Sequence, residues 1–377
     1  MVTTDSKTAI FIKWLVDSFE KCPQKIAVID DAGKRKTTYE ELYVMACRVV
    51  GYTRKQQLPS HSFIGICLPT SMEYIAAEIG IWLAGHAIVP MGDQFPESRI
   101  KQIMEHSDSP LLIDEKVMSE IASTEPVEPS TLPEEDDINS MFYTSGSTGK
   151  PKGVLHSFRS FGIPLFPDKM FKDLDVSIMA VTAPMFFVAC KLIYDFVTRG
   201  KTVNIVPPAV RMDIRKLEDF LAQQEIEFVF IPPSVLPYFN NKSQTLKVVF
   251  TASERVSGVG PKGYKLVNYC GQTETAGIGA TFMVDKPYDN TPIGIPVEPY
   301  IYSVQDQDGN EVPFGEEGEL CYRGDLTPGY YKDPERTAQL YRGGWLHTGD
   351  IVRARPDGNL IYVNRKDWMM KINGQRV

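Results

Sequence analysis

The residues best suited to chemistry lie in the stretch 143–153, which reads YTSGSTGKPKG. Its glycines allow the backbone to approach a ligand closely, and its two lysines supply positive charge. Four hydroxyl groups can donate hydrogen bonds, and they belong to Thr144, Ser145, Ser147 and Thr148. A loop of this kind suits a polyphosphate ligand.

Two other interpretations of this stretch can be compared with its spelling. The P-loop of nucleotide triphosphatases, G-x-x-x-x-G-K-[ST], is excluded because Thr144 replaces its first glycine and Pro151 follows Lys150. A flexible Ser/Gly linker is the other alternative. The apolar, strand-like run INSMFY before the stretch and the rigid Pro-Lys-Gly ending are not typical of a linker.

Composition limits the classes of protein to consider. A chain of 377 residues with 43% hydrophobic residues predicts more than one packed unit. The net charge of −8 argues against nucleic acid as a partner. The most apolar segment, 74–92, contains Glu78 and His86 and is too short to span a membrane, so no membrane span is expected.

Cysteine spacing and the amino terminus point to a chain without a disulfide framework or a signal peptide. The six cysteines show no C-x-x-C spacing, which predicts neither a zinc site nor disulfides and fits a cytoplasmic location. Near the amino terminus, apolar residues recur on one helical face and predict a surface helix; they are Ile10, Phe11, Trp14, Leu15 and Phe19.

The distribution of apolar runs predicts an α/β fold. Short β-like runs alternate with helical periodicity up to about residue 290, which is typical of parallel α/β units. After that point the sequence has strand-like runs separated by Asp-Gly and Phe-Gly turns. We therefore expect two doubly wound α/β subdomains, 1–180 and 181–290, followed by a small β-barrel at 291–366.

Seven stretches occur together in the order found in one superfamily. They are TTYEEL (37–42), WLAGHAIVPMGDQFPESRI (82–100), YTSGSTGKPKG (143–153), NYCGQTE (268–274), GELCYRGDLTPGYY (318–331), WLHTGD (345–350) and NRKDWMMKINGQRV (364–377). With these motifs the chain resembles the adenylate-forming superfamily, which includes acyl- and aryl-CoA ligases and nonribosomal peptide synthetase adenylation domains. The resemblance runs from about residue 19 to the last residue.

The resemblance implies a two-step reaction and assigns residues to it. A carboxylate attacks the α-phosphorus of ATP, pyrophosphate leaves, and a thiol of CoA or of a carrier protein captures the acyl-AMP. Positioning and charge neutralisation dominate such phosphoryl chemistry. Residues implied to hold the triphosphate are Thr144, Ser145, Gly146, Ser147, Thr148, Gly149 and Lys152. Thr273 would contact the α-phosphate and Glu274 would ligate Mg²⁺.

The nucleoside end is assigned in the same way. Asp350 would accept hydrogen bonds from the ribose hydroxyls, with Arg365 in support, and the other nucleotide contacts would come from Ala252, Ser253, Glu254, Tyr269, Cys270, Gly271 and Tyr362. Cys270 departs from the family, which has an aromatic residue before this glycine to stack on adenine; Tyr269 stands one place early and could line the acyl pocket instead. Asn364 replaces a usual glycine. Taken singly, Glu274 could also be a solvated helix residue, Asp350 a turn residue and Arg365 a surface cation.

The implied substrate is a carboxylic acid without an α-amino group. Amino-acid-activating relatives carry a Phe-Asp pair whose aspartate receives the ammonium group, and the corresponding pair here is Phe186-Phe187. Burying an unpaired ammonium is costly. The remaining predicted pocket residues are Val188, Lys191, Phe230, Phe250, Ala252, Tyr269, Gly277 and Ile278. The aromatic residues favour a short or planar acid. Lys191 could pair with a second substrate carboxylate, but we expect its side chain to point to solvent.

Three alternatives remain open from the sequence. The chain could be an aryl or short-acyl ligase core, an amino-acid adenylation domain with an unconventional amine contact, or a non-catalytic adenylate-binding module. The family's hinge maps to Asp367, and the resemblance implies a further domain of roughly a hundred residues that carries the adenylation lysine. We expect that the sequence 367–377 is the start of that domain, cut at the hinge, and that the C-terminal domain itself is absent from these 377 residues.

Overall fold

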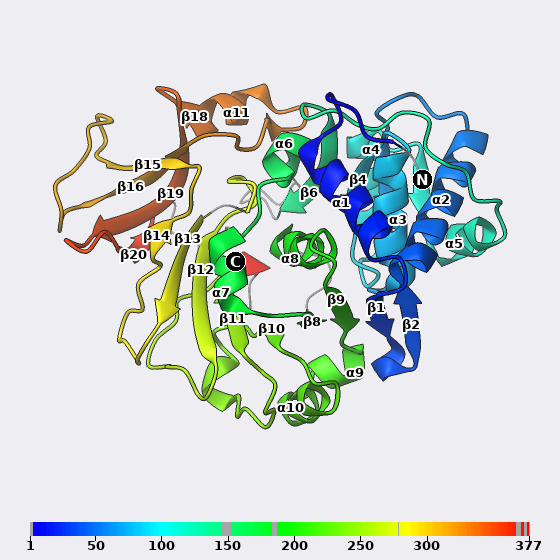
Figure 1. Cartoon of the computed structure of the whole chain (residues 1–377). Helices are drawn as coiled ribbons and strands as arrows, with labels where there is room; N and C mark the ends of the chain where they lie inside the picture. The colour runs from blue at the N-terminus through cyan, green and yellow to red at the C-terminus, as the bar shows by residue number, and fades with distance from the viewer. Residues whose placement is uncertain are drawn as a thin grey trace. The chain divides into compact units, whose positions relative to one another are not determined.

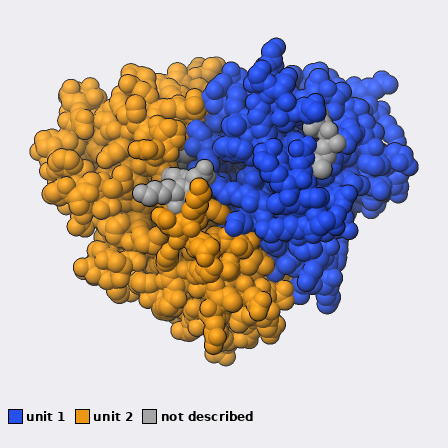
Figure 2. Space-filling view, viewed as in Figure 1, with its two compact units in different colours: residues 1–164, 183–205, 330–332 blue, residues 165–182, 206–329, 333–377 orange. Residues whose placement is uncertain are grey.

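A computed structural model describes residues 3–144, 152–166, 168–182, 187–277, 279–366, 371–372 and 375–376. The chain forms two compact units, coloured separately in Figure 2. Unit 1 comprises residues 1–164, 183–205 and 330–332, and unit 2 comprises residues 165–182, 206–329 and 333–377. Both units combine helices with sheets, which confirms the predicted α/β fold class. The finer division into three consecutive subdomains stays a prediction.

The strand pairs of unit 1 are mostly parallel. Figure 1 shows the course of the chain, coloured from blue at the amino terminus to red at the carboxyl terminus. One sheet has the order β17-β7-β6-β4-β3-β5, in which β5, β3, β4 and β6 run parallel and β7 is antiparallel to β6. Its strands are β3 (Phe63–Ile66), β4 (Ala87–Pro90), β5 (Leu111–Ile113), β6 (Ile138–Thr144), β7 (Lys152–Ser157) and β17 (Gly329–Tyr330). Separately, β1 (Ile26–Asp30) pairs with β2 (Arg35–Thr38) and with β9 (Thr202–Ile205).

The helices of unit 1 are positioned by local capping and by an aromatic core. They are α1 (Ile10–Lys21), α2 (Tyr39–Lys55), α3 (Met72–Leu83), α4 (Glu97–Ser107), α5 (Glu115–Ala122), α6 (Phe158–Phe161) and α8 (Phe187–Val197), with a short 3₁₀ turn at Asp31–Gly33. Ser71 caps α3 by accepting a hydrogen bond from the backbone N–H of Tyr74. Buried Trp82 packs against Phe11 and Tyr194 with ring centroids 5.4 and 4.7 Å apart. The predicted amino-terminal helix is thus confirmed, and Phe11 is buried in the core.

The larger sheet part of unit 2 has the order β14-β13-β12-β11-β10-β8. The strands β8, β10, β11 and β12 are parallel to one another. β13 is antiparallel to β12, and β14 is antiparallel to β13. The strands are β8 (Ile178–Val181), β10 (Phe228–Phe230), β11 (Val248–Ala252), β12 (Lys265–Gly271), β13 (Gly279–Val284) and β14 (Ile295–Pro296). A core of apolar side chains that includes Leu217, Val249 and Leu266 packs beneath it.

An antiparallel sheet follows in unit 2, where the sequence predicted turn-rich strands. It consists of β15 (Ile301–Gln305), β16 (Glu317–Arg323), β18 (Tyr341–Arg342), β19 (Trp345–Ala354) and β20 (Leu360–Arg365), and a separate hairpin joins β21 (Lys371–Ile372) and β22 (Gln375–Arg376). The helices of unit 2 are α7 (Asp168–Leu174), α9 (Pro208–Arg211), α10 (Ile214–Gln223) and α11 (Pro334–Leu340), with a 3₁₀ turn at Leu236–Tyr238. In the described parts of the chain, no helix is long and apolar enough to cross a membrane.

Candidate functional site

The glycine- and hydroxyl-rich stretch connects the two antiparallel strands β6 and β7 of unit 1. Thr144 is the last residue of β6, Lys152 is the first residue of β7, and the two are paired across the hairpin. The Nζ atom of Lys152 lies 5.8 Å from the centre of the Tyr330 ring. The strands show that this stretch is not a linker between independent segments. Five of the predicted phosphate contacts, Ser145, Gly146, Ser147, Thr148 and Gly149, lie outside the described residues.

In unit 2, predicted site residues gather where parallel strands end. Phe230, Ala252 and Gly271 are the last residues of β10, β11 and β12. Because neighbouring parallel strands end at one edge of a sheet, ligands of α/β proteins commonly bind there. Ser253, directly after β11, adopts a positive φ of 80°, which is uncommon for a residue with a side chain and concentrates at functional sites. Glu254 follows it and is partly buried.

The carboxylate of Asp350, on β19, is the centre of the candidate site in unit 2. Only 6% of Asp350 is exposed. Its Oδ1 atom lies 3.0 Å from an Nη atom of Arg365, and the side-chain amide of Gln272 donates to its Oδ2 atom at 2.6 Å. Its backbone N–H donates to the hydroxyl of Thr348 at 3.0 Å. Asp350 is therefore a buried acceptor that Arg365 and Gln272 fix in position within a strand, and the interpretation of Asp350 as a turn residue is wrong. The interpretation of Arg365 as a surface cation is also wrong, because its side chain is only 11% exposed.

Gln272 was not predicted from the sequence, although it belongs to the GQTE motif. Besides Asp350, its amide donates to the backbone carbonyl of Thr348 at 2.9 Å. The backbone N–H of Lys366 donates to the carbonyl of Gly349 at 2.8 Å. Gly349 has a φ of +74°, and a Cβ atom there would lie 3.0 Å from the Arg365 guanidinium. Gln272 and Gly349 thus fix the segment that presents the Asp350 carboxylate.

Tyr362, on β20, lies near the Asp350 carboxylate. The guanidinium of Arg255 lies 5.9 Å from the centre of the Tyr362 ring and donates to the carbonyl of Val363 at 3.0 Å. Burial, with a smaller contribution from the Asp350 charge, raises the pKa of Tyr362 to about 12. Tyr362 is therefore a neutral phenol at physiological pH, and Arg255 is a further residue that the sequence did not indicate.

The turn after β12 carries the two residues predicted to act on phosphate and metal. Thr273 is partly exposed, whereas Glu274 is only 3% exposed, so the interpretation of Glu274 as a solvated helix residue is wrong. A buried carboxylate in a polar turn matches the oxygen ligands that Mg²⁺ prefers. The Glu274 carboxylate is therefore consistent with the predicted Mg²⁺ contact.

Tyr269 and Cys270 are neighbours on β12 and point to opposite faces. Tyr269 is 2% exposed and its ring lies 5.3 Å from that of Phe250. Phe250 in turn packs at 6.2 Å from Phe230. Three predicted pocket residues of unit 2 are therefore in one aromatic cluster. Gly277 lies in the turn after β12 with a φ of +71°, and Ile278 lies outside the described residues.

The predicted pocket residues of unit 1 lie at the start of α8. Phe187 stacks on His156 with centroids 4.1 Å apart and contacts Phe142 edge-on at 5.0 Å. Burial, with a smaller effect of the Lys191 charge, holds the pKa of His156 well below its usual value, so the stacked ring is neutral. Val188 is partly buried on the same helix, while Phe186 and the predicted hinge residue Asp367 lie outside the described residues.

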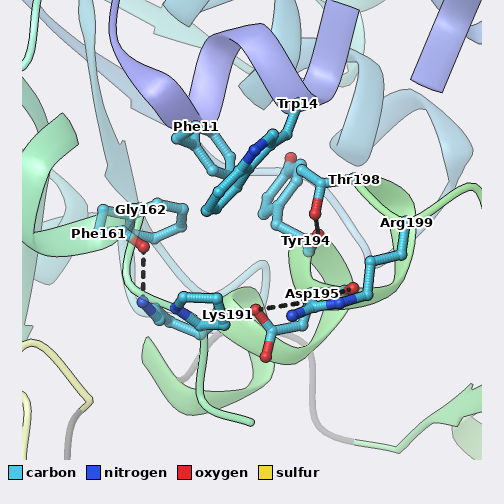
Figure 3. A pocket seen from close by; sticks show the side chains of 10 residues that line it. Phe11, Trp14, Phe161, Gly162, Lys191, Tyr194, Asp195, Thr198 and Arg199 are labelled. Atoms are coloured by element: carbon cyan, nitrogen blue, oxygen red, sulfur yellow. Dashed lines mark hydrogen bonds and ion pairs between the residues drawn. The ribbon is translucent and has the colours of Figure 1, made fainter. Parts of the chain in front are cut away.

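The expectation that Lys191 points to solvent is wrong. Its side chain is 2% exposed, and its Nζ atom donates to the carbonyl oxygen of Phe161 at 2.5 Å and to that of Ile163. Burial lowers the pKa of Lys191 to about 8. Figure 3 shows this side chain at a small pocket whose other labelled walls include Trp14 and Asp195. The backbone carbonyls satisfy the ammonium group, which explains its burial.

Comparison with known proteins identifies the family. The family model described as "AMP-binding enzyme" matches residues 15–331. The chain belongs to the AMP-binding enzyme family. This confirms the resemblance to the N-terminal core of adenylate-forming proteins. Bacitracin synthase 1 of Bacillus licheniformis is 28% identical over 385 residues, which cover 95% of this chain and 7% of that protein. This AMP-binding chain therefore spans less than a tenth of that relative.

Two solved structures share the fold of this AMP-binding chain. An artificially fused adenylation-PCP di-domain NRPS, NpsA-ThdA from Klebsiella oxytoca, matches with a TM-score of 0.87 and 22% identity over 99% of this chain and 82% of that one. The NpsA N-terminal subdomain from the same organism, in complex with 3-hydroxybenzoyl-AMSN, matches with a TM-score of 0.82 and 21% identity over 95% of this chain and all of that one.

Proposed function

We propose that this chain binds ATP and activates a carboxylic acid as an acyl-AMP, which then passes to a thiol. The observation that carries the proposal is the geometry around Asp350. Gln272 and Arg365 hold the two carboxylate oxygens in place, and a carboxylate is an acceptor for hydrogen bonds from hydroxyl groups. Two adjacent hydroxyl groups of a ribose match a fixed carboxylate in this way.

The remaining parts of the chain have complementary tasks in the proposal. Lys152, the first residue of β7, would contact the triphosphate together with the phosphate contacts expected from the sequence between β6 and β7. Glu274 would hold Mg²⁺, which supplies positive charge to the phosphate oxygens when bound. Thr273, beside it in the turn, donates its hydroxyl to the α-phosphate. Tyr269 packs on Phe250, and in this proposal its ring lines the acyl pocket and does not stack on adenine.

The proposed substrate is an aryl or short acyl acid. Among the described residues, the Phe187 ring contacts the rings of His156, Phe142 and Phe161, none of which carries a negative charge. An α-ammonium group placed there would lose its hydration without gaining a counter-charge. The related N-terminal subdomain of NpsA holds a ligand with a 3-hydroxybenzoyl group, which is consistent with a planar acyl pocket in this fold.

A second candidate is an amino-acid adenylation domain of a nonribosomal peptide synthetase. It is favoured by the match to an adenylation-PCP di-domain NRPS and by the similarity to Bacitracin synthase 1. The same matches support a carrier protein as the acceptor, with CoA as the alternative. A cytoplasmic location is part of both candidates.

The test of the nucleotide site is a binding comparison between two carboxylate substitutions. Asp350→Asn should weaken the binding of AMP and ATP by about 10- to 100-fold, because a hydrogen bond to a charged acceptor and the Arg365 ion pair are lost together. Asp357→Asn, which changes an exposed turn carboxylate, is the matched control. Calorimetric affinities that are equal in the two variants would exclude Asp350 from the nucleotide site.

The acid is identified by pyrophosphate release from a carboxylate panel, measured with the whole protein in which this chain occurs.

A further inference from the structure

Two strands of the antiparallel sheet in unit 2 bring a carboxylate, a thiol and an imidazole together. Glu319 and Cys321 are two residues apart on β16 and therefore share one face of the sheet. His347 on β19 is paired directly with Cys321 in the antiparallel register. One potential ligand atom from each of the three residues lies within 4.8 Å of the other two. None of these residues has a task in the proposed reaction.

The spacing of the three donors resembles that of a metal site. The Nδ1 atom of His347 lies 3.3 Å from the Sγ atom of Cys321 and 3.1 Å from the Oε2 atom of Glu319. In a tetrahedral zinc site with bonds of about 2.0 to 2.3 Å, neighbouring donors lie about 3.3 to 3.7 Å apart. An ion could therefore enter with shifts of only a few tenths of an ångström.

The donor types select the class of metal. Thiolate and imidazole bind zinc and softer divalent ions, whereas Mg²⁺ and Ca²⁺ require oxygen ligands. Cys321 is fully buried, Glu319 is 6% exposed and the His347 side chain is 11% exposed. Three protein ligands and one open position, available to water, are sufficient for a four-coordinate ion.

Two cations already lie near the carboxylate and would compete with a metal. Lys366 and Arg342 each approach the Oε2 atom of Glu319 to 3.3 Å. Their side chains are 49% and 52% exposed, so both can turn toward solvent. The other oxygen, Oε1, accepts the backbone N–H of Gly349 at 3.0 Å and keeps the carboxylate oriented. The metal thus has to displace two exposed ion pairs, which are individually weak.

We propose that Glu319, Cys321 and His347 form a binding site for Zn²⁺ or a divalent ion of similar preference. The thiol loses its proton to solvent when the ion binds. Gly349, which holds Glu319, directly precedes Asp350 in β19, so the metal site stands next to the strand segment that carries the candidate ribose carboxylate. The proposal concerns metal binding only and does not depend on the reaction proposed above.

Cadmium titration of the metal-stripped chain tests this site, because a Cd²⁺–thiolate bond gives a characteristic ultraviolet charge-transfer absorbance. We expect one Cd²⁺ ion per chain, displaced by Zn²⁺ in competition. Cys321→Ser should abolish the band, and His347→Gln should weaken binding by at least about tenfold. Cys67→Ser, which removes a partly buried thiol elsewhere, is the matched control and should leave the band unchanged.

One substitution distinguishes a metal site from a simple cluster of hydrogen bonds. Arg342→Met removes a cation that competes for Glu319 and leaves all three ligand residues in place, and it should tighten Cd²⁺ binding about two- to fivefold. Near-ultraviolet circular dichroism of each variant establishes that it is folded. The absence of a charge-transfer band in the folded wild-type chain would overturn the proposal, and so would a stoichiometric band that persists in Cys321→Ser.

Discussion

The side-chain amide of Gln272 donates to the Oδ2 atom of Asp350 at 2.6 Å and to the carbonyl of Thr348 at 2.9 Å, so one buried amide fixes both the carboxylate and the strand that carries it. Gln272 follows β12 of the mixed sheet, whereas Asp350 lies in β19 of the antiparallel sheet. This amide therefore joins the two sheets of unit 2 at the candidate ribose site.

Replacing Gln272 by Leu should weaken AMP binding by about tenfold. Leucine has a similar volume but leaves the Oδ2 atom of Asp350 and the Thr348 carbonyl without these donors, and a buried acceptor without a donor is costly. Calorimetric titration with AMP measures the effect. Gln102→Leu on the exposed face of α4 is the control, and equal affinities in both variants would contradict this role for Gln272.

Lys152 should act on the outer phosphates of ATP and not on the nucleoside. Because Lys152 begins β7 beside the hairpin connection, Lys152→Met is expected to weaken ATP binding by at least about tenfold while AMP binding stays within about twofold. The ratio of the two affinities is the informative measurement. Lys116→Met, which changes an exposed lysine on α5, controls for the loss of a positive charge. A parallel loss of AMP affinity would assign Lys152 to folding instead.

Glu78 makes the stability of the chain depend on pH. This carboxyl on α3 is completely buried, and burial raises its pKa to about 7 although Tyr194 and other side chains donate to it. In the unfolded chain it titrates near 4.5. Because the folded-state pKa is the higher one, the stability that the protonated carboxyl contributes is fully present below pH 4.5 and is lost as the pH rises through about 7.

Glu78→Gln should remove this dependence. Relative to the wild-type chain, the variant is expected to gain up to about 3 kcal/mol in the free energy of unfolding between pH 4.5 and pH 7, since 2.5 pKa units separate the two states. Urea unfolding of both proteins across this range measures the difference. Glu120→Gln, at an exposed carboxylate on α5, should show no such trend. A constant difference between wild type and Glu78→Gln would refute the assigned pKa.

The α/β architecture and the amino-terminal helix could be predicted because the period of apolar residues is a local property of a sequence. Phe11 and Leu15, for example, lie four residues apart and are both buried by α1. Long-range partners could not be predicted. Gln272 and Asp350 are 78 residues apart, and only the fold brings them together. The same limit explains why cysteine spacing indicated no zinc site although Cys321 meets His347 across two strands.

Lys191 shows a different limit of sequence analysis. Lysine is rarely buried, so a solvent-directed side chain was the natural expectation. Two carbonyl groups accept its hydrogen bonds: that of Phe161, the last residue of the short helix α6, and that of Ile163, two residues beyond it. Carbonyl groups at a helix end lack partners within the helix and can receive a cation. The sequence shows neither where α6 ends nor that α8 packs beside that end.

Substrate choice should depend on Phe187. We expect the whole protein to prefer a phenylpropanoate or cinnamate over phenylalanine by at least about 100-fold in kcat/KM, because an ammonium group at the ring of Phe187 would be desolvated without a counter-charge. Phe187→Asp should narrow this preference by weakening the acid more than the amino acid. Phe187→Leu, which also removes the stacking ring but stays apolar, separates the charge effect from lost packing and should keep the preference.

His156, stacked on this ring at 4.1 Å, would lie beside the new carboxylate, so the two could pair and blunt the gain for the amino acid. If the wild-type protein activates phenylalanine better than its des-amino analogues, the aryl-acid assignment is wrong and the amino-acid adenylation candidate replaces it.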